Sequence, residues 1–156
     1  METQSLNFYN LALDFCIFVE KQGISKDTLR DTAHYLSALY NAALAINYKA
    51  GGHLKTSEIN RKPRLNLAKI HISDEIKSNY YKVFNPFVDE TVACSLCDDI
   101  CDIYNDLQEG VEKYESGDHS TAAYIWGFYF ENHWGRHCLG ALAALHQTLY
   151  ELEWES

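Results

Sequence analysis

The sequence has few helix-breaking residues and no long apolar run. Its 156 residues include only 2 prolines and 8 glycines, which excludes a collagen-like chain and a long Gly/Pro-rich linker. No uninterrupted apolar stretch approaches the roughly 20 residues that a membrane-spanning helix needs. The first four residues lack the basic start of a secretion signal. We therefore expect a cytoplasmic protein that does not insert into membranes.

Basic residues are scarce as well. The 13 lysines and arginines face 22 acidic residues, which gives a formal net charge of −9. Such a charge repels nucleic-acid phosphates and anionic membranes, so we expect neither as a partner. The positive charge is uneven, because residues 49–72 hold six basic residues and one acid. This segment predicts a basic connecting loop, and either the loop or the acidic body can dock a protein partner.

The number of cysteines does not suit a disulfide framework. The count is odd, and three of the thiols, Cys94, Cys97 and Cys101, fall at helical spacing around the start of one predicted helix, which indicates free, buried thiols. The five are Cys16, Cys94, Cys97, Cys101 and Cys138.

Apolar residues, by contrast, are plentiful. They make up 47% of the chain, and aromatic residues make up 13%. This is enough material for one ordinary hydrophobic core and argues against disorder. The length and composition therefore predict a single domain over residues 1–156.

The apolar residues recur every three or four positions in four long segments, which is typical of helices. These segments are residues 5–22, 25–47, 95–117 and 120–150. Gly23 and Gly117 stand where the first and third of these helices would end. Ser95 and Asp98 have the spacing of an acidic variant of the capping box, which marks a helix start.

A fifth, short helix is predicted over residues 73–83. Ser73 is a candidate N-cap, and Ile76, Tyr80 and Val83 follow at helical spacing. Asn85-Pro86 would end this helix. No strand-like alternation is strong enough to compete. The expected fold is therefore all-α, a single helical bundle of four long helices plus one short helix.

Carboxylates crowd the predicted helix over residues 95–117. Residues 98–106 contain four aspartates and no basic residue. Asp99, Asp102 and Asp106 lie at positions i, i+3 and i+7 and share one stripe of the helix, while Asp98 points further outward. Like charges so placed repel one another. A cation, a proton or a histidine is therefore expected beside them.

Two histidines of the last helix suit this role. His133 and His137 are one turn apart on a largely apolar side, so their imidazoles should point inward and need partners. Helical bundles build metal sites from carboxylates and imidazoles on facing helices. The resulting hypothesis is one divalent metal ion that activates water for hydrolysis. Its candidate ligands are Asp99, Asp102, Asp106, His133 and His137.

A structural interpretation of the same residues stays open. Each histidine can simply donate to an aspartate in a buried polar network. Arg136 can pair with Asp102 or Asp106 and occupy that carboxylate. The protein would then be a non-catalytic interaction or structural protein, so the sequence leaves open whether it is an enzyme.

An alternative metal site could consist of Cys94, Cys97, His133 and His137. We favour it less, because the cysteines fall on the opposite flank of their helix from Asp99. A redox Cys-x-x-Cys usually follows a strand, and none is expected before Cys94. The sequence also lacks a nucleophile elbow, a P-loop and a dinucleotide fingerprint.

Three stretches carry a family resemblance. They are Phe-Asn-Pro-Phe-Val-Asp-Glu at 84–90, Leu-Cys-Asp-Asp-Ile-Cys-Asp-Ile-Tyr-Asn-Asp-Leu at 96–107, and His-Trp-Gly-Arg-His at 133–137. Together they resemble a bacterial domain-of-unknown-function family of small all-helical proteins. The resemblance covers the C-terminal half, and the N-terminal half matches loosely. It implies an all-helical protein of this size, and it implies no activity and no catalytic residues.

Overall fold

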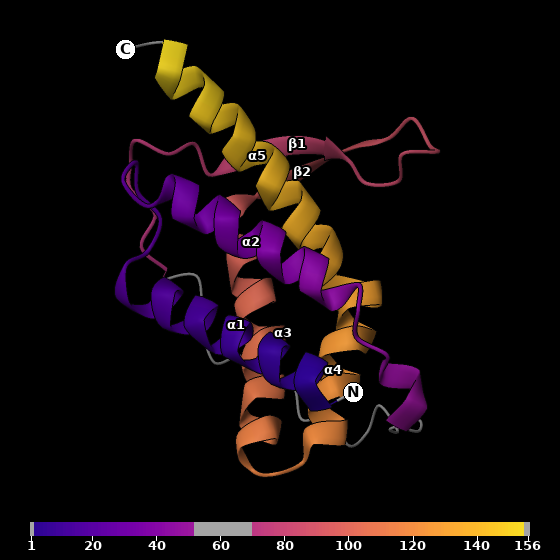
Figure 1. The fold of residues 1–156 in the computed structure, drawn as a ribbon. Coiled ribbons are helices and arrows are strands. Elements are labelled where there is room, and N and C mark those ends of the chain that lie inside the picture. Colours follow the sequence, from indigo (N-terminus) through magenta and orange to yellow (C-terminus); the bar gives the residue numbers. More distant parts are fainter. Residues whose placement is uncertain (1, 52–69, 155–156) are drawn as a thin grey trace.

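The computed structural model describes residues 2–51 and 70–154 and is mostly helical (Figure 1). Residues 52–69 of the predicted basic loop lie outside the described residues. The elements in chain order are α1 (Glu2–Lys21), α2 (Leu29–Ala43), a 3₁₀ turn (Tyr48–Gly51), β1 (Asn79–Val83), β2 (Thr91–Ser95), α3 (Leu96–Glu115), α4 (His119–Tyr129), a π-helical turn (Phe130–Trp134) and α5 (Gly135–Trp154). No helix within these two described ranges is long and apolar enough to cross a bilayer.

The prediction of four long helices is confirmed. They are α1, α2, α3 and the helical run from 119 to 154, in which α4, the π turn and α5 follow one another without a break. Helix α3 packs against α1, α4 and α5. The core between them contains the fully buried Phe8, Trp126 and Trp134. The Trp126 indole N–H donates to the carbonyl oxygen of Leu107 on α3 at 3.0 Å, so this buried polar atom is satisfied.

The helix ends follow the local signals in the sequence. Gly23 and Gly117 have φ angles of +66° and +88°, in the left-handed region that favours glycine after a helix. The Ser95 hydroxyl accepts the N–H of Asp98 at the start of α3. Helix α2 is shorter than predicted, because Ser25 and Thr28 form a hydrogen-bonded turn before it.

The short helix predicted over residues 73–83 is wrong. Residues 79–95 instead form an antiparallel hairpin of β1 and β2, in which Tyr80 pairs with Cys94 and Lys82 pairs with Val92. The turn of the hairpin extends away from the helices (Figure 1). Its Asn85 side chain accepts the N–H of Phe87 at 3.0 Å, as asparagine commonly does in turns.

The reason for this error lies in the packing of the hairpin. Tyr80 and Lys82 are both partly buried, and their neighbours in β1 are exposed, which is the two-residue period of a strand. The spacing of Ile76, Tyr80 and Val83 also suits a helix, so local periodicity does not decide between the two. Contact with α5 favours the strand.

Candidate metal centre

The aspartates of α3 face the π turn and the start of α5. Asp99 is 2% exposed and Asp106 is 5% exposed, whereas Asp102 between them is partly buried. Two nearly buried carboxylates need strong partners, because burial of an uncompensated charge is costly. The hydrophobic side of α3, which includes Ile100, Ile103 and Leu107, turns these carboxylates toward the other helices.

The histidines come from the π turn and the helix that follows it. His133 lies within the π turn and His137 lies in the first turn of α5. A Cβ atom at Gly135 would lie 2.4 Å from the carbonyl oxygen of Phe130. Only glycine therefore suits this position, where the wider turn brings position 135 close to the carbonyl five residues earlier. Such π turns occur often at functional sites.

Each histidine is held by one buried aspartate. The Nδ1 atom of His137 lies 2.7 Å from Asp99 Oδ1, and the Nδ1 atom of His133 lies 2.6 Å from Asp106 Oδ2. A carboxylate only accepts hydrogen bonds, so each Nδ1 carries the proton and donates. In each ring Nε2 is then the nitrogen that can ligate a cation. Metal-binding histidines are oriented in this way by carboxylates behind them.

Asp102 completes a group of three possible ligands. Its Oδ2 atom lies 3.4 Å from His137 Nε2. One carboxylate oxygen of Asp102 and one ring nitrogen each of His133 and His137 lie within 4.8 Å of one another. The two imidazole rings are 4.9 Å apart at 68°. These three residues can therefore hold one metal ion, with Asp99 and Asp106 behind the histidines.

The charge of Asp102 depends on its surroundings. Partial burial raises the pKa of the Asp102 carboxyl above its ordinary value, and the neighbouring imidazoles of His137 and His133 oppose this rise. A carboxylate in such a position gains from a nearby positive charge. A bound divalent cation would supply that charge.

Tyr80 is a member of this cluster that the sequence analysis missed. Its hydroxyl donates to Asp99 Oδ2, so both oxygens of Asp99 accept a hydrogen bond. Burial and this bond raise the pKa of Tyr80 well above its ordinary value. The local sequence placed Tyr80 on a helix and held no signal for this contact, because the contact depends on how the hairpin packs.

The alternative in which Arg136 pairs with Asp102 or Asp106 does not occur among the described residues. The Arg136 guanidinium instead lies 4.8 Å from the centre of the Phe84 ring. Arg136 forms no ion pair with any described residue. The carboxylate of Asp102 therefore stays directed toward the histidines.

The alternative site of cysteines and histidines does not form. In the described part of the chain, the group that can hold a metal contains no cysteine, and all five thiols are free. The expectation that no strand precedes Cys94 is wrong, since Cys94 lies in β2 directly before α3. Burial nevertheless raises the pKa of Cys97, which disfavours the thiolate that redox chemistry requires.

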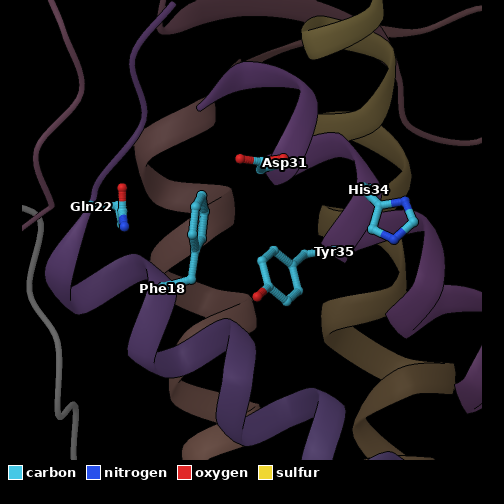
Figure 2. A pocket seen from close by; sticks show the side chains of 5 residues that line it. All are labelled: Phe18, Gln22, Asp31, His34 and Tyr35. Atoms are coloured by element: carbon cyan, nitrogen blue, oxygen red, sulfur yellow. The ribbon is translucent and has the colours of Figure 1, made fainter. Parts of the chain in front are cut away.

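A separate cavity lies between α1 and α2. It measures about 380 Å³ and is lined by Phe18, Gln22, Asp31, His34 and Tyr35. Figure 2 shows the Phe18 and Tyr35 rings side by side within it. None of these residues belongs to the Asp/His cluster, and so the cavity is not part of the candidate metal centre.

Comparison with known proteins identifies the class of this chain. Residues 1–151 match the family described as a domain of unknown function, DUF5063. The chain belongs to this family, and the match covers both halves of the chain, whereas the motifs noted above lie in the C-terminal half. The comparison with curated proteins returns no match.

A solved structure shares the fold. It is the crystal structure of protein BF1032 from Bacteroides fragilis, which is 19% identical to this chain with a TM-score of 0.64. The match covers 93% of this chain and 94% of that one. At this identity the likeness concerns the fold alone.

Proposed function

We propose that this protein binds one divalent transition-metal ion through Asp102, His133 and His137 and uses the ion in hydrolysis. The observation that carries the proposal is the arrangement of the two histidines. Each has its Nδ1 atom bonded to a buried aspartate, and each lies with a ring nitrogen near the Asp102 carboxylate. Neutral imidazole nitrogens and a carboxylate oxygen are all acceptors, so they converge favourably only around a cation or a proton.

The ligand types indicate which metals suit the site. Imidazole nitrogen is a ligand for zinc, iron and related ions, whereas magnesium and calcium prefer oxygen ligands. Two histidines and one carboxylate occur both in catalytic zinc sites and in non-haem iron(II) sites. We therefore expect a transition metal rather than magnesium.

Three protein ligands leave room for a further ligand. When bound, such an ion lowers the pKa of a coordinated water toward neutrality and so supplies a hydroxide nucleophile. In hydrolysis the water oxygen forms the new bond and the bond to the leaving group breaks with its electron pair. The protons of the water pass to solvent and to the leaving group. The chain's own contribution is to orient the ligands through Asp99 and Asp106.

The metal content of the untagged protein tests this proposal. Metal-free protein incubated with equimolar zinc, iron(II) or manganese and then desalted should retain about one equivalent of at least one metal. His137→Ala and Asp102→Asn should lose it. Two matched controls, His146→Ala on the exposed side of α5 and Asp98→Asn on the exposed side of α3, should retain it. Wild-type protein that holds none of these metals, or variants that all hold them equally, would show that the site is not a metal centre.

Activity is a separate measurement. The metal-loaded protein should hydrolyse at least one member of a panel of carboxylic and phosphoric esters, and His137→Ala should not. If the metal binds and the whole panel is left unchanged at rates equal to those of His137→Ala, the metal site stands and the hydrolytic assignment is wrong.

A second candidate function is non-catalytic. It is supported by the hydrogen bonding of the described residues, in which no buried side-chain nitrogen or oxygen lacks a partner. The Asp99–His137 and Asp106–His133 pairs would then join α3 to the last helix, and the acidic surface would engage a basic protein partner. In that case His137→Ala lowers the melting temperature, and the wild-type protein retains no metal.

A further inference from the structure

We infer that Lys82 and Arg136 form an anion-binding pair beside the candidate metal centre, and that they bind a phosphate group of the substrate. This inference rests on the proposed function, because it names the substrate class of the same site. It is carried by the packing of the hairpin on α5 and by the partners of the two cations.

The hairpin brings Lys82 to the part of α5 that carries His137. Tyr80 and Lys82 lie on one face of β1, two residues apart. The hydroxyl of Tyr80 bonds to Asp99, which holds His137. The Nζ atom of Lys82 lies 3.5 Å from the carbonyl oxygen of Arg136, the residue directly before His137. Lys82 is thus the cation that the hairpin adds to this part of α5.

A glycine in α5 makes this contact possible. A Cβ atom at Gly140 would lie 2.4 Å from the Tyr80 hydroxyl oxygen and 2.7 Å from Lys82 Nζ. Because position 140 has no side chain, the Tyr80 hydroxyl and the Lys82 ammonium group can both pack against α5 at this point. The same glycine couples the positioning of Asp99 to the positioning of Lys82.

Arg136 is held without losing its hydrogen-bond donors. Its guanidinium lies 4.8 Å from the centre of the Phe84 ring, and Phe84 directly follows β1. Contact with a ring face uses the flat side of the guanidinium, so its N–H groups stay available at the edge. In the described part of this acidic protein, neither Arg136 nor Lys82 forms an ion pair with a carboxylate.

The charges of the centre favour an anionic substrate. Asp99, Asp102 and Asp106 contribute −3, and a divalent ion reduces this to −1. Lys82 and Arg136 add +2, so the complete centre carries +1. A phosphate monoester dianion suits the two cations, because the arginine fork matches two phosphate oxygens and the lysine acts as a compact point charge.

Titration with inorganic phosphate tests the inference. The protein is used both metal-free and loaded with one metal equivalent, desalted, and its heat of binding is measured with phosphate and with acetate as the comparison anion. Arg136→Gln and Lys82→Gln should each weaken phosphate binding about ten-fold or more, with unchanged metal content. Arg136→Lys should retain part of the affinity.

The matched control is Arg30→Gln. Arg30 pairs with Glu153, which lies 17 residues after Arg136 in α5 and so about 25 Å along the helix. This variant should bind phosphate as the wild type does. The inference is wrong if phosphate binding is absent, if it is equal in wild type and in both glutamine variants, or if acetate binds as tightly as phosphate.

The two proposals fail separately in this design. If neither the wild type nor any of these variants holds metal, the proposed function is wrong, and the metal-free titrations still show whether phosphate binding depends on Lys82 and Arg136. If metal is retained in every variant and phosphate binding does not respond to Lys82 or Arg136, the anion site is wrong and the metal site stands.

Discussion

His137 and Asp99 form a partly buried hydrogen bond between α5 and α3, with 2.7 Å between Nδ1 and Oδ1. The second oxygen of the same carboxylate accepts the hydroxyl of Tyr80 from the hairpin. Asp99 therefore joins three elements that are far apart in the sequence. Its position sets the orientation of the imidazole that the candidate metal centre uses.

Replacement of Asp99 tests this relationship. Asp99→Asn removes the charge that supports the imidazole and places an amide beside two donors. Metal affinity should fall about 10-fold to 100-fold, as is typical for a group behind a metal-binding histidine. Competition with a chromophoric chelator measures the affinity. Asp98→Asn, one residue earlier and exposed, should leave the metal affinity unchanged. An equal loss of affinity in both variants would show that Asp99 does not specifically orient His137.

Gly135→Ala tests the π turn. Glycine to alanine within a helix usually stabilises a protein by up to about 1 kcal/mol. Here the new Cβ would lie 2.4 Å from the Phe130 carbonyl oxygen. We therefore expect destabilisation by about 1–3 kcal/mol, measured by denaturant unfolding. Metal retention should fall as well, because the turn places His133. A stabilised variant would show that position 135 is an ordinary helical position.

The N-cap of α4 predicts a pH dependence of stability. The Asp118 carboxylate accepts hydrogen bonds from Thr121 at the start of the helix, and these bonds lower the pKa of Asp118. A lowered pKa in the folded state adds stability that is present above the ordinary pKa of aspartate and is lost as the pH falls through the lowered value. Asp118→Ala should cost about 1 kcal/mol near pH 7, and less at lower pH.

Asp118→Asn is the control for this prediction. Asparagine caps a helix about as well as aspartate but does not titrate, so the variant should keep most of the stability at neutral pH. Thermal unfolding of the three proteins between pH 3 and pH 7 measures the difference. If Asp118→Ala loses the same stability at every pH, the capping carboxylate does not titrate as described.

Thiol labelling tests the packing of the cysteines. Burial raises the pKa of Cys16 well above its ordinary value and raises the pKa of Cys138 to about 12. Their thiols should react with a disulfide reagent at pH 8 only after unfolding. Cys94 is partly exposed and should react first in the native protein. Cys94→Ser should remove this fast phase, and labelling of Cys138 in the same phase would contradict its burial.

Much of the fold could be predicted from local signals. Ser95 and Asp98, the apolar stripe after them and Gly117 define α3, because caps and helical periodicity act within a few residues. The hairpin could not be predicted in this way. The residues around Tyr80 fit both a three-to-four-residue and a two-residue period, and the choice depends on contact with α5.

The candidate site could likewise be predicted only in part from the sequence. The sequence determined which side chains share a helix face: Asp99, Asp102 and Asp106 on one helix, His133 and His137 on another. This follows from helical geometry alone. The tertiary structure decided which aspartate holds each histidine, brought Tyr80 to Asp99 and placed Arg136 over Phe84. These contacts join residues up to about 50 positions apart, and their distances depend on how whole elements pack, which no local pattern encodes.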